Sequence, residues 1–432
     1  MIDTAKDTKK QVERAVIIGI KHQDQLESEV EEHLDELAEL VQNLSINVVG
    51  RVVAPVKNPG VEFYVGTGKA NEIIELMKQL NADSLIFNDS LSPSQQRNWE
   101  KLSKVCVVDR EEIIIDIFAS RAITREAVLQ VELARMKYYL PRLSKAWTHL
   151  SRQRGGAKGT RGEGETQIEV DRRMVKREIA QLTKELAEVR KQRNTTRKLR
   201  ERRSIIHGAI VGYTNVGKSS LLKALSGASV LVEDKLFATL DPTTRKIKLP
   251  NNQEILLTDT VGFVRDLPHD LVEAFKSTLE EAKLADFLIL VLDISSPILF
   301  EQWETTLDVL HDLGAQDKDI LVVLNKIDKI DAEDEVFAIA KSRLVANNGV
   351  YISTKTGRNM DSLVKKISEI VDTKLSKLRV LLPPSRHDLM AFAHKNGAVL
   401  SEEYDERGYL HLVINIPQEY FHKFEPFILN DN

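Results

Sequence analysis

The chain of 432 residues has little cysteine and no long apolar run. Its single cysteine, Cys106, cannot form an internal disulfide, and its place in the apolar run 105–108 predicts a small buried residue. No stretch of about 18 apolar residues occurs, so we expect no transmembrane helix. The N-terminal residues lack the apolar stretch of a signal peptide. We therefore expect a cytoplasmic protein, and a membrane-associated fraction stays open.

The net charge is only −4, but the charge is unevenly distributed. Residues 135–203 hold 21 lysines and arginines against 8 acidic residues, a surplus of 13 positive charges. The rest of the chain therefore carries a net charge of −17. Segregation on this scale indicates that one part of the molecule meets a polyanion while the remainder stays soluble.

A phosphate-binding loop follows the apolar run 205–211 and precedes a helix-forming stretch at 220–225. In this context the two glycines let backbone amides turn inward around phosphates, whereas an isolated match could be a chance glycine-rich turn. Lys218 can reach the β- and γ-phosphates as a catalytic residue, and Ser219 can hold Mg²⁺. We expect eight residues of this loop to contact the nucleotide: Gly212, Tyr213, Thr214, Asn215, Val216, Gly217, Lys218 and Ser219.

Base recognition is predicted where the apolar run 320–324 ends in Asn325, Lys326, Ile327 and Asp328. The carboxyl ends of strands are where open α/β sheets bind ligands. Asp328 can accept from guanine N1–H and N2–H₂, whereas adenine offers no such donor pair. Backbone groups of Ser353, Thr354 and Lys355 can meet the guanine O6 edge. The nucleotide is therefore GTP.

Two segments between these motifs complete the predicted site. Asp259, Thr260, Val261 and Gly262 form Asp-x-x-Gly, which suits a water-mediated Mg²⁺ contact and a catalytic N–H from Gly262 to the γ-phosphate. The segment predicted to fold over the nucleotide consists of Phe237, Ala238, Thr239, Leu240 and Asp241. Thr239 is the expected second Mg²⁺ ligand and a catalytic residue, because Phe237 and Leu240 can anchor it by packing. Thr243 and Thr244 are the alternatives.

Phe263 follows Asp-x-x-Gly, where the best-studied small GTPases carry a glutamine that orients water. A phenylalanine cannot hydrogen-bond water, so another group must position the nucleophile, or hydrolysis waits for a partner. Slow hydrolysis that a partner stimulates is the expectation.

The order of predicted strands and helices, together with the charge distribution, divides the chain into four predicted parts. Residues 1–120 alternate strands and amphipathic helices, which predicts a small parallel-sheet α/β domain. Within it, Gly66, Thr67, Gly68 and Lys69 are better explained as a strand-to-helix turn than as a second nucleotide site, although that alternative stays open. A basic helical hairpin at 121–205, a P-loop GTPase domain at 206–375 and a small α+β domain at 376–432 follow.

The predicted hairpin has helices at 126–152 and 168–202 and a tip, 154–164, with five glycines that disfavour helix. The second helix has apolar residues at a spacing suited to pairing with the first, namely Ile168, Met174 or Val175, Ile179, Leu182, Leu186 and Val189. The aromatics Tyr138, Tyr139 and Trp147 and the arginines around the tip favour contact with nucleic acid over a solvated coiled coil.

These motifs together resemble the HflX family of bacterial ribosome-associated GTPases over nearly the whole chain. The most specific resemblance lies in 162–173, where the glycine-rich loop passes into Glu-Thr-Gln, and in 65–69, 87–96 and 135–143. Two positions depart from the usual pattern: Glu163 stands where proline is common, and Thr354 stands where alanine is frequent.

The resemblance implies binding to the large ribosomal subunit and its ribosomal RNA, with the hairpin tip reaching toward the peptidyl-transferase centre, and splitting of stalled ribosomes. A GTP-gated assembly factor for the large subunit and a free RNA-binding or remodelling protein are the alternatives. We expect a monomer.

Overall fold

The structure is a computed structural model, and it describes residues 12–143, 167–201, 205–227, 237, 242–250, 253–265, 281–330, 349–416 and 420–429. The chain forms two compact units. Unit 1 runs to Val189 and includes Phe237, and unit 2 begins at Arg190 and contains the other described residues.

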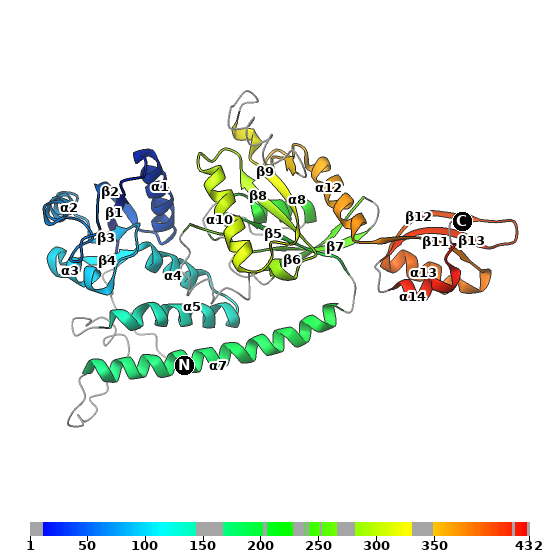
Figure 1. Cartoon of the computed structure of the whole chain (residues 1–432), viewed down its shortest axis with the longest axis horizontal. Coiled ribbons are helices and arrows are strands. Elements are labelled where there is room, and N and C mark those ends of the chain that lie inside the picture. The colour runs from blue at the N-terminus through cyan, green and yellow to red at the C-terminus, as the bar shows by residue number, and fades with distance from the viewer. Residues whose placement is uncertain are drawn as a thin grey trace. The chain divides into compact units, whose positions relative to one another are not determined.

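Unit 1 contains a four-stranded parallel sheet in the order β2-β1-β3-β4 (Figure 1). The strands are β1 (Arg14–Lys21), β2 (Asn47–Pro55), β3 (Ser84–Phe87) and β4 (Cys106–Asp109). The connecting helices are α1 (Glu27–Asn43), α2 (Thr67–Gln79) and α3 (Pro93–Ser103), and α4 (Arg110–Arg121) follows β4. Six residues of β1 are buried because helices cover a parallel sheet on both faces. The predicted parallel α/β architecture is confirmed.

Residues 66–69 form the N-cap and first turn of α2. Gly66 is the N-cap of α2, and Lys69 pairs with Glu72 one turn along the helix at 2.9 Å, both at the surface. This geometry agrees with a strand-to-helix turn.

Cys106 is solvent-exposed, so the prediction of a buried cysteine is wrong. It is the first residue of β4, which lies at the edge of the sheet. Side chains alternate between the two faces of a strand, and here Val107 is the buried neighbour.

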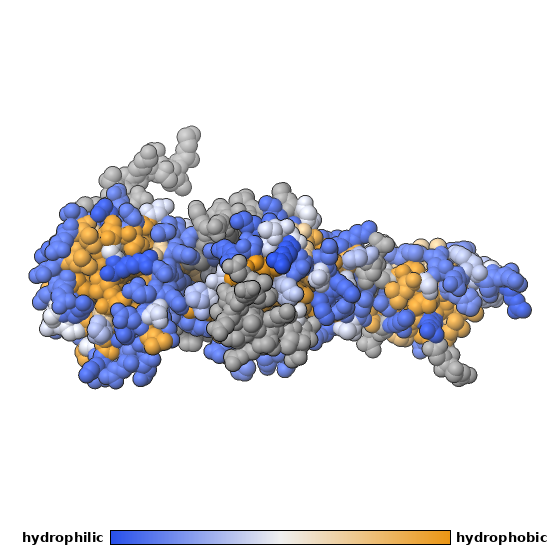
Figure 2. Space-filling view, turned by 90° about the horizontal axis from the view of Figure 1, so that it is seen from above, coloured by the Kyte–Doolittle hydropathy of each residue, from blue (hydrophilic) through white to orange (hydrophobic). Residues whose placement is uncertain are grey.

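The surface of unit 1 is partly apolar. Hydrophobic residues gather on this unit in Figure 2, at the left end of the view. Along the edge strand β2, partly exposed side chains include Val48, Val49, Val52 and Val53.

Two helices pair in the hairpin, α5 (Arg125–Tyr139) and α7 (Gln167–Glu201), and α7 belongs to unit 1 as far as Val189. Leu129, Leu133 and Met136 of α5 pack against Leu186 and Val175 of α7 in two adjoining clusters. Val175 is buried and Met174 is half exposed, so Val175 is the residue of the predicted seam.

The first arm is interrupted earlier than predicted. The α-helix ends at Tyr139, and a 3-10 turn, η1 (Leu140–Arg142), follows because Pro141 cannot continue the backbone ladder. The predicted tip, together with Trp147, lies outside the described residues.

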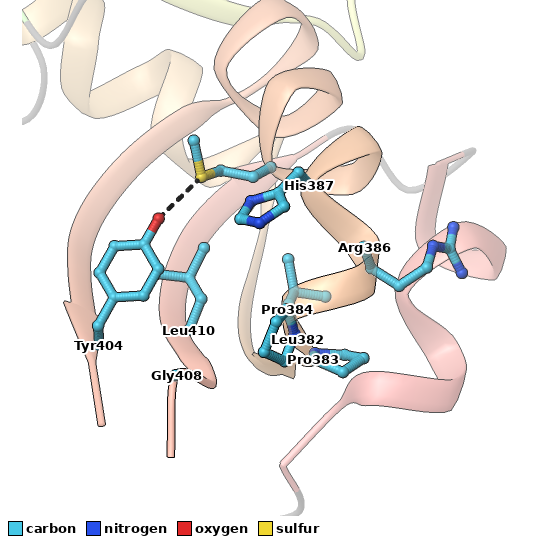
Figure 3. Close-up of a pocket in the computed structure, with 9 residues that line it drawn as sticks. Leu382, Pro383, Pro384, Arg386, His387, Tyr404, Gly408 and Leu410 are labelled. Atoms are coloured by element: carbon cyan, nitrogen blue, oxygen red, sulfur yellow. Dashed lines mark hydrogen bonds between the residues drawn. The ribbon is translucent and has the colours of Figure 1, made fainter. Parts of the chain in front are cut away.

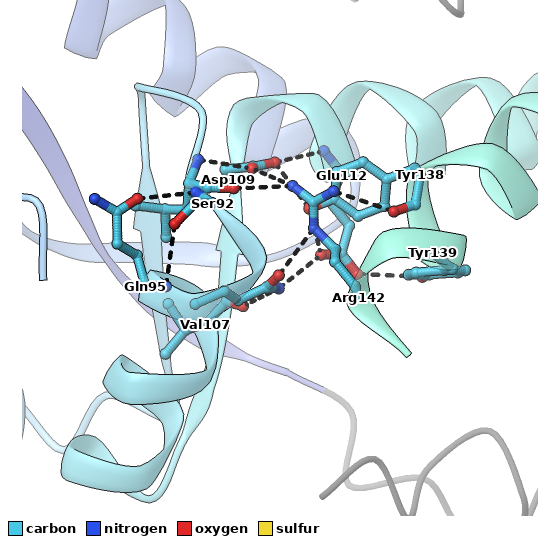
Figure 4. Close-up of polar contacts among 10 residues, drawn as sticks. Ser92, Gln95, Val107, Asp109, Glu112, Tyr138, Tyr139 and Arg142 are labelled. Carbon is cyan, nitrogen blue, oxygen red and sulfur yellow. Dashed lines mark hydrogen bonds and ion pairs between the residues drawn. The ribbon is translucent and has the colours of Figure 1, made fainter. Parts of the chain in front are cut away.

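Tyr138 is buried, which contradicts its predicted role in nucleic-acid contact. Its hydroxyl shares one proton between Asp109 at 3.0 Å and Glu112 at 3.2 Å, and Tyr139 donates to the other oxygen of Glu112 at 3.2 Å (Figure 4). Arg142 stacks over the Tyr138 ring and donates to Asp109 at 3.2 Å. These residues form a buried polar cluster that fixes the end of α5 to the α/β sheet.

Unit 2 is built on a six-stranded sheet in the order β10-β9-β8-β5-β7-β6, parallel except for β6 (Figure 1). Its strands are β5 (His207–Gly212), β6 (Thr243–Lys248), β7 (Glu254–Asp259), β8 (Phe287–Asp293), β9 (Asp319–Asn325) and β10 (Gly349–Tyr351). Its helical elements are α8 (Lys218–Ser226), α10 (Leu299–Asp312), η2 (Ile327–Lys329) and α12 (Met360–Thr373). The predicted P-loop GTPase fold is confirmed.

The C-terminal part of unit 2 contains a three-stranded antiparallel sheet in the order β11-β13-β12. Its strands are β11 (Ser376–Leu382), β12 (Ala398–Tyr404) and β13 (Leu410–Ile416). Its helical elements are η4 (Pro384–Arg386), α13 (His387–Asn396), α14 (Phe421–Phe424) and η6 (Glu425–Phe427). A small pocket lies between α13 and the sheet, where the Tyr404 hydroxyl donates to the Met390 sulfur at 3.4 Å (Figure 3). The α+β class is as predicted, although the sequence did not reveal β11.

Candidate nucleotide-binding site

The loop between β5 and α8 requires glycine at both ends. Gly212 has φ +143°, and a Cβ there would lie 2.2 Å from the Val291 carbonyl oxygen. Gly217 has φ +98°, and a Cβ there would lie 2.3 Å from the Asn325 amide nitrogen. Larger residues would displace β8 or the base-recognition motif, so the loop's close packing explains both glycines.

Lys218 is buried inside this loop. Its Nζ donates to the carbonyl oxygens of Gly212 at 3.1 Å and Tyr213 at 2.6 Å. Burial lowers the pKa of Lys218 to about 8, and the nearby Asp259 carboxylate opposes the change. A buried ammonium that donates to two carbonyl oxygens beside one carboxylate is suited to the charge of a phosphate.

The Asp-x-x-Gly segment lies against the phosphate-binding loop. The Ser219 hydroxyl donates to the Asp259 carboxylate at 2.6 Å. A Cβ at Gly262 would lie 2.8 Å from Cγ2 of Thr214 and 2.9 Å from Nζ of Lys218, so only glycine allows this approach. Ser219 and Asp259 present hard oxygen donors of the kind that Mg²⁺ prefers.

Phe263 is buried, and its backbone binds the phosphate-binding loop. Thr214 N donates to the Phe263 carbonyl at 2.8 Å, and Phe263 N donates to the Gly212 carbonyl at 3.1 Å. The Tyr213 hydroxyl accepts from the backbone N–H of Arg265 at 2.6 Å. The residue at the usual glutamine position therefore contributes backbone contacts and no polar side chain.

The base-recognition residues meet at the ends of β9 and β10. Asn325 donates to the Val216 carbonyl at 2.8 Å and accepts from Thr354 N at 3.1 Å, which joins this motif to the phosphate-binding loop. The Ser353 hydroxyl donates to Asp328 at 2.6 Å. That hydrogen bond is the main cause that lowers the pKa of Asp328, so the carboxylate is held ionised as a base acceptor requires.

Asp293, at the end of β8, is a residue of this region that sequence reasoning missed. Its carboxylate pairs with Lys326 Nζ at 2.7 Å and accepts from the Ser295 hydroxyl at 2.6 Å. The position of an acidic residue at a third strand end was the available signal.

Several predicted site residues face the core. The side chains of Val216, Val261 and Ile327 are buried, and the Thr260 hydroxyl donates to the Ile210 carbonyl at 2.8 Å. Any contact of these residues with nucleotide would use the backbone. Asn215 has φ +59°, and Lys355 is exposed.

Of the segment predicted to fold over the nucleotide, only Phe237 is described. Its ring is buried and packs edge-on against Phe118 of α4, with 4.6 Å between the ring centroids. Ala238, Thr239, Leu240 and Asp241 lie outside the described residues, so the Mg²⁺ role of Thr239 stays a prediction. Of the alternatives, Thr244 bonds the Thr258 hydroxyl at 2.8 Å within the sheet.

A glycine-bounded phosphate loop, a buried lysine, an adjoining Asp-x-x-Gly and an ionised base acceptor on neighbouring strand ends define a P-loop GTPase. Three family models match successive segments of the chain, and the description of each one names a GTPase. The description "50S ribosome-binding GTPase" matches residues 207–326, "GTP-binding GTPase Middle Region" matches 121–200, and "GTP-binding GTPase N-terminal" matches 31–119.

The chain is similar to proteins named GTPase HflX. It is 48% identical to that of Akkermansia muciniphila, covering 96% of this chain and 97% of the relative. It is 39% identical to that of Escherichia coli, covering 89% and 90%. The chain belongs to the HflX family of GTPases, and it binds and hydrolyses GTP. Among the described residues, none of the helices combines the length and apolar character needed to span a bilayer.

Proposed function

We propose that this GTPase associates with the large ribosomal subunit and splits or recycles stalled ribosomes. The observation that carries the proposal is the charge surplus of 13 in residues 135–203, which the match to the GTPase middle region largely covers. The match of residues 207–326 to a 50S ribosome-binding GTPase supports the same partner. Ribosomal RNA is the polyanion that a basic helical hairpin suits.

Mg²⁺ is the proposed cofactor. Ser219 and Thr239 would ligate it, and Asp259 would contact it through water, since their oxygens are hard donors. The ion supplies charge neutralisation for the phosphates when bound. This chain's own residues do the remaining work: Lys218 holds phosphate oxygens, the Gly262 N–H meets the γ-phosphate, and Asp328 fixes the base.

Subunit separation tests the splitting function directly. Purified protein and GTP are added to intact ribosomes, and the fractions of joined and separate subunits are followed by sedimentation. We expect separation that requires GTP and fails with the Lys218→Ala variant. Binding to large subunits without separation would refute splitting and favour the assembly-factor alternative, whereas equal affinity for unrelated RNA at physiological salt would favour a free RNA-binding protein.

The hairpin is tested by removing charge at its predicted tip. Replacing Arg152, Arg154, Lys158 and Arg161 with alanine should weaken large-subunit binding and flatten its salt dependence by about 0.9 per lost phosphate contact. Basal GTP binding should not change, because the phosphate-binding loop, Asp-x-x-Gly and the base-recognition residues belong to unit 2. The matched control removes four exposed positive charges of unit 2 by alanine replacement of Lys248, Lys365, Lys377 and Arg407. If both variants lost large-subunit binding equally, the loss would come from the change in net charge. That result would contradict a specific role for the tip.

A further inference from the structure

Thr214 has a buried hydroxyl that the fold leaves unsatisfied. The residue is 5% exposed, and its Oγ1 has no hydrogen-bond partner among the described residues. A buried hydroxyl without a partner destabilises the folded state, so such groups call for an explanation. Thr214 lies in the phosphate-binding loop, where the missing partner would be a ligand.

The position of Thr214 indicates a ligand in the region where the γ-phosphate is predicted to bind. Its Cγ2 and Nζ of Lys218 both lie within 3 Å of the point that a Cβ of Gly262 would occupy. Thr214 is therefore found where the loop, the phosphate-binding lysine and the Asp-x-x-Gly glycine meet. Its backbone N–H is already bonded to the Phe263 carbonyl at 2.8 Å, so the side-chain hydroxyl is the donor that Thr214 can offer a ligand.

The same region lacks the group that usually orients the nucleophile. Phe263 is 1% exposed and has no polar side-chain atom. A threonine hydroxyl carries one donor and two acceptor lone pairs, so it can accept from a water while donating to a phosphoryl oxygen. It is thus able to hold the nucleophile beside the γ-phosphate.

We propose that Thr214 is a catalytic residue whose hydroxyl orients the water that attacks the γ-phosphorus. The water oxygen forms the new bond to phosphorus, the bond from phosphorus to the β–γ bridging oxygen breaks, and GDP leaves with that electron pair. The proton of the water ends on inorganic phosphate or solvent. Thr214 contributes orientation and neither gains nor loses a proton overall.

Two variants distinguish the effect of the Thr214 hydroxyl on hydrolysis from the effect of the side-chain shape. Thr214→Val keeps the branched shape and removes the hydroxyl, whereas Thr214→Ser keeps the hydroxyl and removes the methyl group. Single-turnover GTP hydrolysis should fall about 10- to 100-fold in the valine variant, as expected when one positioned polar group is lost from a transition state. The serine variant should stay within about threefold of the native rate.

Binding and stability give readouts that a structural role would change differently. GDP affinity should stay within about threefold of native in both variants, because the water is absent from the GDP complex. The melting temperature of the nucleotide-free valine variant should equal or exceed the native value, since the unsatisfied hydroxyl is gone. Thr306→Val is the control: its buried hydroxyl bonds the Gln302 carbonyl at 2.7 Å in α10, and hydrolysis should not change.

The proposal is overturned if the valine variant hydrolyses GTP within twofold of native, or if serine is as slow as valine. It is also overturned if GDP affinity or the melting temperature falls in step with hydrolysis, because the defect would then be a damaged loop.

Discussion

Replacement of Glu112 by glutamine should stabilise unit 1 at neutral and alkaline pH. Glu112 belongs to the buried polar cluster at the end of α5 (Figure 4). Burial, with the nearby charges of Asp109 and Asp116, raises the pKa of Glu112 from 4.5 to about 7, and hydrogen bonds from Tyr139 and Tyr138 only partly oppose this. The cluster therefore favours the protonated acid.

The sign follows from the two pKa values. Below pH 4.5 Glu112 is protonated in both folded and unfolded chains, and its contribution to stability is complete. As pH rises from 4.5 through 7, the unfolded state ionises more readily, so folding stability is lost. A shift of about 2.5 units at 1.36 kcal/mol each gives a loss of roughly 3 kcal/mol at pH 8.

Glutamine fits the same contacts. One oxygen of Glu112 accepts from Gln96 at 3.3 Å and from Tyr138, and the Gln side-chain oxygen can take that place. The other oxygen meets the Tyr139 hydroxyl, which can accept from the Gln NH₂. The substitution thus removes the ionisation with little change in shape.

The assay is urea unfolding followed by the fluorescence of Trp99, which is fully buried in the core of unit 1. Trp147 and Trp303 are first replaced by phenylalanine, so that the signal reports this unit alone. The difference in unfolding free energy, glutamine variant minus native, should be about 1 kcal/mol at pH 5 and about 3 kcal/mol at pH 8. Glu75→Gln, at an exposed site on α2, should change stability by less than about 0.5 kcal/mol throughout. A difference that does not vary with pH, or a variant less stable than native at pH 8, would refute the reasoning.

Two further predictions concern the nucleotide site. Because Lys218 has a pKa lowered to about 8 by burial, and phosphate should hold it protonated, GDP affinity should fall as pH rises through 8, by about sevenfold at pH 8.8. Equilibrium titration with labelled GDP, below the pH at which guanine ionises, measures this, and a constant affinity from pH 7 to 8.8 would contradict it. Asp328→Asn should shift preference from GTP towards xanthosine triphosphate, whose C2 carbonyl accepts from the new amide; competition binding with an unchanged order would show that Asp328 does not contact the base.

Local signals in the sequence were enough to predict the two α/β sheets and the position of the phosphate-binding loop. The apolar runs of β1, β5 and β9 are the direct signature of strands buried on both faces. Glycine at 212 and 217 and lysine at 218 predict a phosphate loop because backbone and charge requirements act within a few residues. Asp328 could be named as the predicted base acceptor because its carboxylate matches the donor pair of guanine.

Tertiary packing decided what these local signals could not. Tyr138 was predicted to meet nucleic acid, yet it is buried, since its partners Asp109 and Glu112 are 29 and 26 residues away in the chain. Cys106 was predicted to be buried, yet it is exposed, because strand order placed β4 at an edge.

The base-recognition region shows the same division. The residue type of Lys326 is local information, whereas its pairing with Asp293 arises because β8 and β9 are neighbours in the sheet. The Thr214 hydroxyl likewise became informative only when the fold showed that its backbone bonds Phe263 and its side chain has no partner among the described residues. The sequence by itself determined which chemical groups are present and the local structure that carries them. Distances between groups far apart in the chain, and the burial that sets their pKa values, depend on how the sheets and helices pack, and only the tertiary structure decided them.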